Sequence, residues 1–155
     1  MLDGSDKTRR ILMAGQIDRT AGAIASGLFQ HMLVGARPKH VYLVESAGTH
    51  DGEFGLPATN EARQYMASFC HIDIAERQSQ SLRQIVNLSV FSMIVCLEPE
   101  VRTELLGTGI SSTVPVVMVR EPGGIQRPSR NDLDDYRRYV KELWDALQKI
   151  IDTRL

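Results

Sequence analysis

Cysteine is scarce in this 155-residue chain, and its two cysteines, Cys70 and Cys96, do not form a CxxC pair. A disulfide framework is therefore not expected, and a reducing, cytoplasmic setting is the default expectation. The four histidines are scattered, so no group of residues has the spacing of a metal site, and no metal or other cofactor is expected. No apolar run approaches the roughly 18 residues of a membrane-spanning helix, so membrane insertion is not expected either.

An excess of one charge is also missing, because 18 Lys and Arg residues nearly balance 19 Asp and Glu residues. Without a basic field, the chain has no electrostatic reason to bind nucleic acid. Residues 1–8 are polar and lack the apolar core of a signal peptide, so they are expected to form a loose leader. The length of the remainder, residues 9–155, suits one domain with a substantial core.

Four short apolar runs are present, at residues 9–15, 40–46, 91–98 and 114–121. Their apolar character is continuous rather than alternating, which is typical of strands buried on both faces of a parallel sheet. Each run ends in a turn signal or a charged residue. The four runs therefore predict a four-stranded parallel sheet.

Helical patterns separate these runs, at residues 20–33, 57–70, 99–106 and 133–150. The last is the clearest, because apolar residues recur at spacings of three and four along it, with Ser129 or Asn131 as its expected cap. The alternation predicts an α/β fold with a doubly wound parallel sheet and right-handed crossovers. Ligands of such folds bind beyond the carboxyl ends of the strands.

The stretch ILMAGQIDRTAG, residues 11–22, reads as a buried strand, a tight turn and the start of a helix. Backbone N–H groups at such a turn form anion-binding sites. Asp18 is unexpected there, because two unit charges about 4 Å apart interact by roughly 4 kcal/mol at an effective dielectric constant of 20. We therefore hypothesise that the Asp18 carboxylate fills the loop and accepts the N–H bonds that a phosphate would take.

This stretch resembles the phosphate-binding loop of the low-molecular-weight protein tyrosine phosphatases, C-x-G-N-x-C-R-S. Gly15, Arg19 and Ala23 match the family, and Thr20 is a conservative variant. Further segments resemble family segments in the same order: VESAGT, GLPATNEAR, HIDIAERQSQSL, MIVCLEPEVRTEL and, at the general-acid loop, VREPGG. The resemblance implies a single domain in which a four-stranded parallel sheet carries helices on both faces.

In this family a Cys thiolate attacks phosphorus, backbone N–H groups and an Arg hold the phosphoryl oxygens, and an Asp protonates the leaving group. By resemblance, Met13 stands at the nucleophile position, Arg19 binds the oxyanion and Glu121 stands at the general-acid position. The walls of the phosphotyrosine slot fall at Gly52 and Gly123. The resemblance also implies a phosphate-binding loop that comprises Ala14, Gly15, Gln16, Ile17, Asp18, Arg19 and Thr20. A thioether has no labile proton, so Met13 cannot form the usual thiophosphate.

The residues also admit readings unconnected with catalysis. Arg19 could form a structural ion pair with Asp18 or Glu121, and Glu121 could be an Arg-paired or surface carboxylate. Cys96 falls within a predicted strand, which favours an inert buried thiol. Asp18 as an aspartyl-phosphate nucleophile is disfavoured, because no second acidic cluster is evident to recruit a metal.

The leading prediction is a catalytically inactive pseudophosphatase with a binding or regulatory role. One alternative is a hydrolase with residual or altered activity at the same loop. Another is a phosphate or phosphoprotein sensor that uses Arg19. A protein or phosphoprotein partner and a monomer or weak homodimer are expected.

Overall fold

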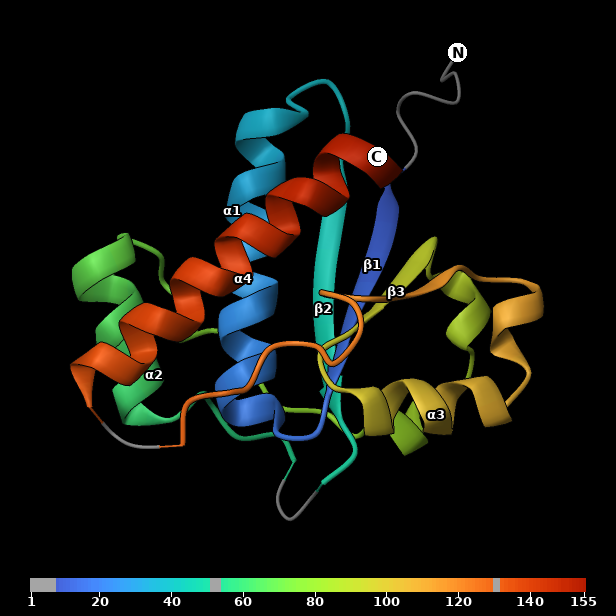
Figure 1. The fold of residues 1–155 in the computed structure, drawn as a ribbon, viewed down its shortest axis with the longest axis horizontal. Coiled ribbons are helices and arrows are strands. Elements are labelled where there is room, and N and C mark those ends of the chain that lie inside the picture. Colours follow the sequence, from blue (N-terminus) through green and yellow to red (C-terminus); the bar gives the residue numbers. More distant parts are fainter. Residues whose placement is uncertain (1–7, 51–53, 130–131) are drawn as a thin grey trace.

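The computed structural model describes residues 8–50, 54–129 and 132–155, so nearly all of the expected leader lies outside the described residues. Its four strands are β1 (Arg9–Gly15), β2 (Tyr42–Gly48), β3 (Met93–Cys96) and β4 (Val116–Met118). All three pairings are parallel, in the order β2-β1-β3-β4 (Figure 1). The predicted four-stranded parallel sheet is confirmed.

The longer helices are α1 (Ala23–Ala36), α2 (Asn60–Tyr65), α3 (Pro99–Gly107) and α4 (Leu133–Arg154). Two π-helical turns, η2 (Asp18–Gly22) and η3 (Met66–Cys70), adjoin α1 and α2. Three 3₁₀ turns complete the list: η4 (Leu82–Gln84), η5 (Leu88–Val90) and η6 (Ile110–Ser112). None of the helices in the described ranges is long and apolar enough to cross a membrane.

Strand β1 is buried on both faces, as its continuous apolar run predicts. Ile11 and Met13 belong to a core formed with α1, α2 and α4, whereas Leu12 and Ala14 belong to a second core that includes residues of α3. Successive side chains of a strand point to opposite faces, so β1 contributes to both cores. The helices therefore lie on both sides of the sheet (Figure 1).

The helix boundaries differ from the sequence prediction where local hydrogen bonding determines them. Helix α1 begins at Ala23 rather than near residue 20, because the preceding turn is wider than an α-helix, with Gly22 N–H donating to Ile17 O at 3.2 Å. The cap of α4 is Asp132, which accepts Asp135 N–H at 2.7 Å. The prediction that Ser129 caps this helix was wrong, and the other expected cap, Asn131, lies outside the described residues.

Candidate anion-binding loop

The loop after β1 is fixed to the carboxyl end of β2. Gly15 lies opposite Gly48 in the parallel register. The carbonyl oxygens of Gly15 and Gln16 accept the N–H groups of Thr49 and His50 at 3.0 and 2.9 Å. Gly48 leaves little room for a side chain, because a Cβ there would lie 3.0 Å from Gln16 O and 3.1 Å from Asp18 Cβ. The loop therefore rests directly on the turn that follows β2.

Met13 lies in the middle of this framework and has no exposed surface. It pairs with Ser46 of β2 on one side and Val95 of β3 on the other, within the core shared with α1 and α4. The position that the resemblance assigns to a nucleophile thus holds a thioether packed in the hydrophobic interior.

The Asp18 side chain is 5% exposed and is directed toward β2 and the segment after η3. Its Oδ2 accepts the Gln80 N–H at 2.9 Å, and the Ser46 hydroxyl donates to the same carboxyl group. Its Oδ1 is buried and has no hydrogen-bond partner among the described residues. The hypothesis that Asp18 accepts N–H groups of its own loop was therefore wrong, because its donors come from β2 and residue 80.

Burial raises the pKa of the Asp18 carboxyl, and the Ser46 and Gln80 hydrogen bonds and the nearby Arg77 only partly oppose this. Arg77 is itself partly buried and donates to Val44 O at 3.0 Å and to Ser26 O at 3.4 Å. Its desolvation lowers the pKa of its guanidinium, against the attraction of Asp18 and Glu45. The buried Asp18 carboxyl and the partly buried Arg77 guanidinium thus lie close to one another beside β2.

The Arg19 side chain is held by a backbone carbonyl. Its Nε donates to Pro57 O at 2.8 Å, and its own carbonyl accepts the Thr59 N–H at 3.0 Å. Among the described residues, the expected ion pairs of Arg19 with Asp18 or Glu121 are not formed. The guanidinium remains the one cationic group that the loop itself contributes.

Glu121 does not take the place expected of a general acid. Its side chain is 63% exposed, and its carboxylate pairs with Arg102 of α3 at 2.5 Å. The alternative interpretation, an Arg-paired surface carboxylate, is the one that the structure supports. The Gly123 that follows is exposed, and Gly52 lies outside the described residues.

The side chain that reaches the loop from this segment is Arg127, which the sequence analysis missed. Its Nη1 donates to Gln16 Oε1 at 2.7 Å and to Glu98 Oε2 at 2.6 Å. The other oxygen of Glu98, Oε1, accepts the Gln16 N–H at 2.8 Å. One signal was available, since Arg127 precedes Pro128 in a second X-Pro pair between β4 and α4.

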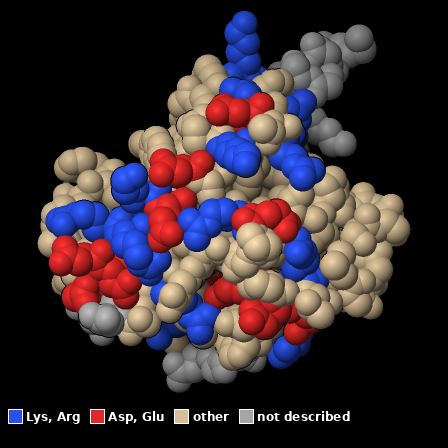
Figure 2. Space-filling view, viewed as in Figure 1, with Lys and Arg blue, Asp and Glu red and all other residues tan. Residues whose placement is uncertain are grey.

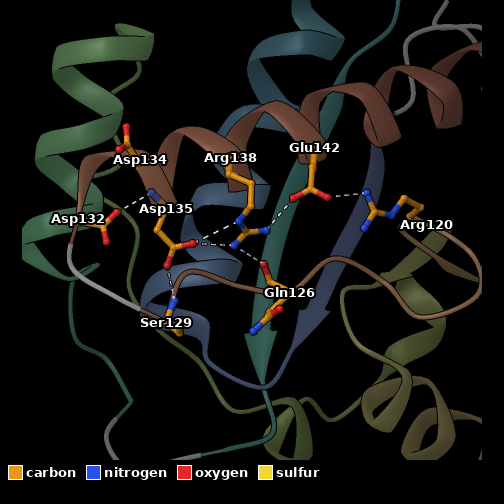
Figure 3. A pocket seen from close by; sticks show the side chains of 8 residues that line it. All are labelled: Arg120, Gln126, Ser129, Asp132, Asp134, Asp135, Arg138 and Glu142. Carbon is orange, nitrogen blue, oxygen red and sulfur yellow. Dashed lines mark hydrogen bonds and ion pairs between the residues drawn. The ribbon is translucent and has the colours of Figure 1, made fainter.

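A charged network fixes the segment that carries Arg127 to α4. Arg138 binds Asp135, Glu142 and the Gln126 carbonyl oxygen, at 2.9, 2.7 and 3.0 Å (Figure 3). These groups line a hollow of about 820 Å³ between the segment and α4. Acidic and basic side chains alternate across this face of the molecule (Figure 2). Arg127 is therefore presented to the loop by an anchored segment.

Solved structures with the same fold align with nearly the whole chain. A low-molecular-weight protein tyrosine phosphatase from T. tengcongensis aligns with a TM-score of 0.81 and 20% identity, over 93% of this chain and 98% of that one. The fold is that of the low-molecular-weight protein tyrosine phosphatases. SP-PTP, a low-molecular-weight protein tyrosine phosphatase from Streptococcus pyogenes, aligns with a TM-score of 0.75 and 16% identity, over 95% of this chain and 93% of that one. The YwlE arginine phosphatase from Geobacillus stearothermophilus aligns with a TM-score of 0.76 and 15% identity, over 93% of this chain and 91% of that one. No protein-family model and no curated protein sequence matches the chain.

Burial affects both cysteine side chains of the chain. Cys96 lies in β3 with no exposed surface, and burial raises the pKa of its thiol to about 12. Cys70 ends the η3 turn, and burial raises the pKa of its thiol as well. Reactive cysteines usually have a lowered pKa, so the raised pKa values disfavour both thiols as nucleophiles, and the predicted burial of Cys96 is confirmed.

Proposed function

We propose that this protein is a phosphatase-fold protein that does not carry out the phosphatase reaction and serves as a binding or regulatory protein in the cytoplasm. The observation that carries the proposal is the position of Met13. A thioether with no exposed surface stands where the fold's chemistry requires a thiolate at the loop. Cys96, in the neighbouring strand, is too well buried to replace it.

The surroundings of the loop support the same conclusion. Glu121 is directed to Arg102, and the side chain that reaches the loop at Gln16 is Arg127, which is not a residue type that serves as a general acid. Among the described residues, neither Met13 nor Glu121 is thus placed to act as the nucleophile or the general acid. The expected ligand is a protein or phosphoprotein partner that recognises the loop after β1.

A second candidate, a sensor of phosphate or of a phosphoprotein without turnover, is favoured by Arg19. Its guanidinium is held by Pro57 O and is not neutralised by Asp18 or Glu121. An arginine in this state can bind an oxyanion through two parallel N–H groups. The remaining candidate, altered hydrolysis at the same loop, would require water as the nucleophile.

The test is an aryl-phosphatase assay of the purified protein at pH 5 to 7, run beside an active phosphatase of the same fold. We expect no hydrolysis above a control without enzyme. Activity at even a thousandth of the active relative, lost on Arg19→Ala but kept on Arg120→Ala, would contradict the proposal. Arg120 is a suitable control because it lies away from the loop, paired with Glu142 at 3.0 Å.

A further inference from the structure

The Glu98 carboxylate is bound at the loop in the way that a protein binds an anionic ligand. The residue is only 8% exposed, and each of its two carboxylate oxygens has its own donor. Oε1 accepts the Gln16 N–H at 2.8 Å and Oε2 accepts Arg127 Nη1 at 2.6 Å. Charge-assisted bonds of this length are among the stronger hydrogen bonds in proteins.

The demands of the adjacent helix do not account for this placement. Glu98 is the N-cap residue of α3, yet its side chain makes no capping hydrogen bond. Pro99 occupies the first turn, where its missing N–H needs no partner. The carboxylate thus turns away from α3 and toward the loop, where it satisfies a backbone N–H and a guanidinium from two other parts of the chain.

Space for an external group lies beside this contact. A hollow of about 450 Å³ is lined by both Glu98 and Arg127, together with Glu100, Ile125 and Pro128 among others. The Arg127 side chain keeps about a third of its surface exposed, so it can be reached from the hollow. The segment that carries it is anchored by the Arg138 bond to Gln126 O (Figure 3).

We propose that Gln16 N–H and Arg127 form an oxyanion site, that Glu98 is its built-in occupant, and that a carboxylate or phosphoryl group of a partner binds by displacing Glu98. This inference rests on the proposed binding role of the same loop and names the chemistry of its ligand. The tethered carboxylate competes with every external oxyanion, because it is always present at high local concentration. The unmodified protein consequently binds free oxyanions weakly.

The experiment is calorimetric titration of the full chain with inorganic phosphate and, separately, with acetate. In the Glu98→Ala variant we expect at least one of these probes to bind tenfold more tightly or better than in the unmodified protein. Adding Arg127→Ala to this variant should remove the gain. The more tightly bound probe distinguishes a phosphoryl from a carboxylate ligand.

The matched control is Glu104→Ala, which removes the same charge from α3 at a carboxylate that pairs with Arg83 at 2.8 Å. Its affinities should stay within twofold of the unmodified protein. An equal gain in this control, or no gain for either probe in Glu98→Ala, overturns the proposal. If Glu98→Ala does not fold, Glu98→Gln replaces it, because it keeps the side-chain volume, and its affinity for phosphate or acetate should also rise. Phosphatase activity in the unmodified protein would contradict the proposed function while leaving this titration decisive.

Discussion

The Asp18 carboxylate lies against the backbone of Gly22, so that a Cβ on Gly22 would overlap Asp18 Oδ1. Both residues belong to the π-helical turn η2, which widens the chain between the loop and α1. Gly22 has ordinary helical dihedral angles, φ −63° and ψ −45°, so its backbone conformation does not require glycine. The requirement comes from the space that the buried carboxylate takes.

Replacing Gly22 by alanine should therefore destabilise the protein, although Gly→Ala in a helix normally stabilises it by about 0.5–1 kcal/mol. We expect Gly22→Ala to lower the free energy of unfolding by roughly 1–3 kcal/mol, the usual cost of overpacking. Urea denaturation measures the change. Gly35→Ala in α1 is the control, since a Cβ there meets nothing within 4 Å, and it should be neutral or stabilising. Gly22→Ala should cost little in an Asp18→Ala background, and an undiminished cost would show that the carboxylate is not the obstacle.

Asp18 should also give the protein a pH-dependent stability. Because burial raises the pKa of the folded carboxyl above its unfolded value of about 3.9, the folded state binds more protons in that interval. Stability therefore falls as the pH rises from about 4 through the raised pKa, and stays reduced above it. Asp18→Asn should gain stability relative to the unmodified protein at pH 8, and this gain should shrink toward pH 4. Urea titrations across this range test the sign, with the exposed Asp134→Asn as a control that should show no such trend.

The two thiols should differ in their reaction with an alkylating reagent. At pH 8 we expect iodoacetamide to modify Cys70 slowly and to leave Cys96 untouched in the folded protein. Cys70 is partly exposed, whereas Cys96 is fully buried and has a thiol pKa raised to about 12. Mass spectrometry counts the adducts, and Cys70→Ser should remain unmodified until urea unfolds it. Rapid modification of folded Cys70→Ser would contradict the inert assignment of Cys96.

The sheet could be predicted from the sequence because its signal is local. Each strand is a short continuous apolar run, and burial on both faces of β1 follows from that run alone. The cap of α4 and the start of α1 were misplaced, because they depend on which side chain or carbonyl completes a hydrogen bond.

The sequence predicts a tight turn after the first strand, and the structure has one there, but the contacts of this turn could not be inferred from spacing. The contacts that decide the site join residues 16, 98 and 127, which approach one another only once the carboxyl ends of the strands meet. A motif assigns Asp18 to the loop but does not say which way its side chain points. The structure directs it to Gln80 N–H, and the carboxylate that binds a loop N–H is Glu98 instead.

Restoring the missing sulfur should not restore catalysis. Met13 has no exposed surface, so the Met13→Cys thiol would be desolvated, which raises a thiol pKa in the way that burial raises that of Cys96 to about 12. The nearby Asp18 carboxylate, when ionised, opposes a thiolate further. We expect Met13→Cys to show no aryl-phosphate hydrolysis above the unmodified protein, measured as kcat/KM at pH 5 to 7.

Two triple variants then test whether a carboxyl at position 121 or at position 127 can act as a general acid. Both contain Met13→Cys and Asp18→Cys, and one adds Glu121→Asp while the other adds Arg127→Asp. The Arg127→Asp carboxyl would fall short of the place that Arg127 Nη1 reaches beside Gln16 and Glu98, because an aspartate side chain is several bonds shorter than that of arginine. A positioned general acid contributes about 10²–10⁴-fold, so this triple variant, which lacks one, should stay within tenfold of the Met13→Cys, Asp18→Cys double variant in kcat/KM. The Glu121→Asp triple variant should not exceed the Met13→Cys, Asp18→Cys double variant, because position 121 is directed to Arg102. A gain of tenfold or more in either triple variant over the double variant would contradict this expectation and would place a general acid at the position that was changed.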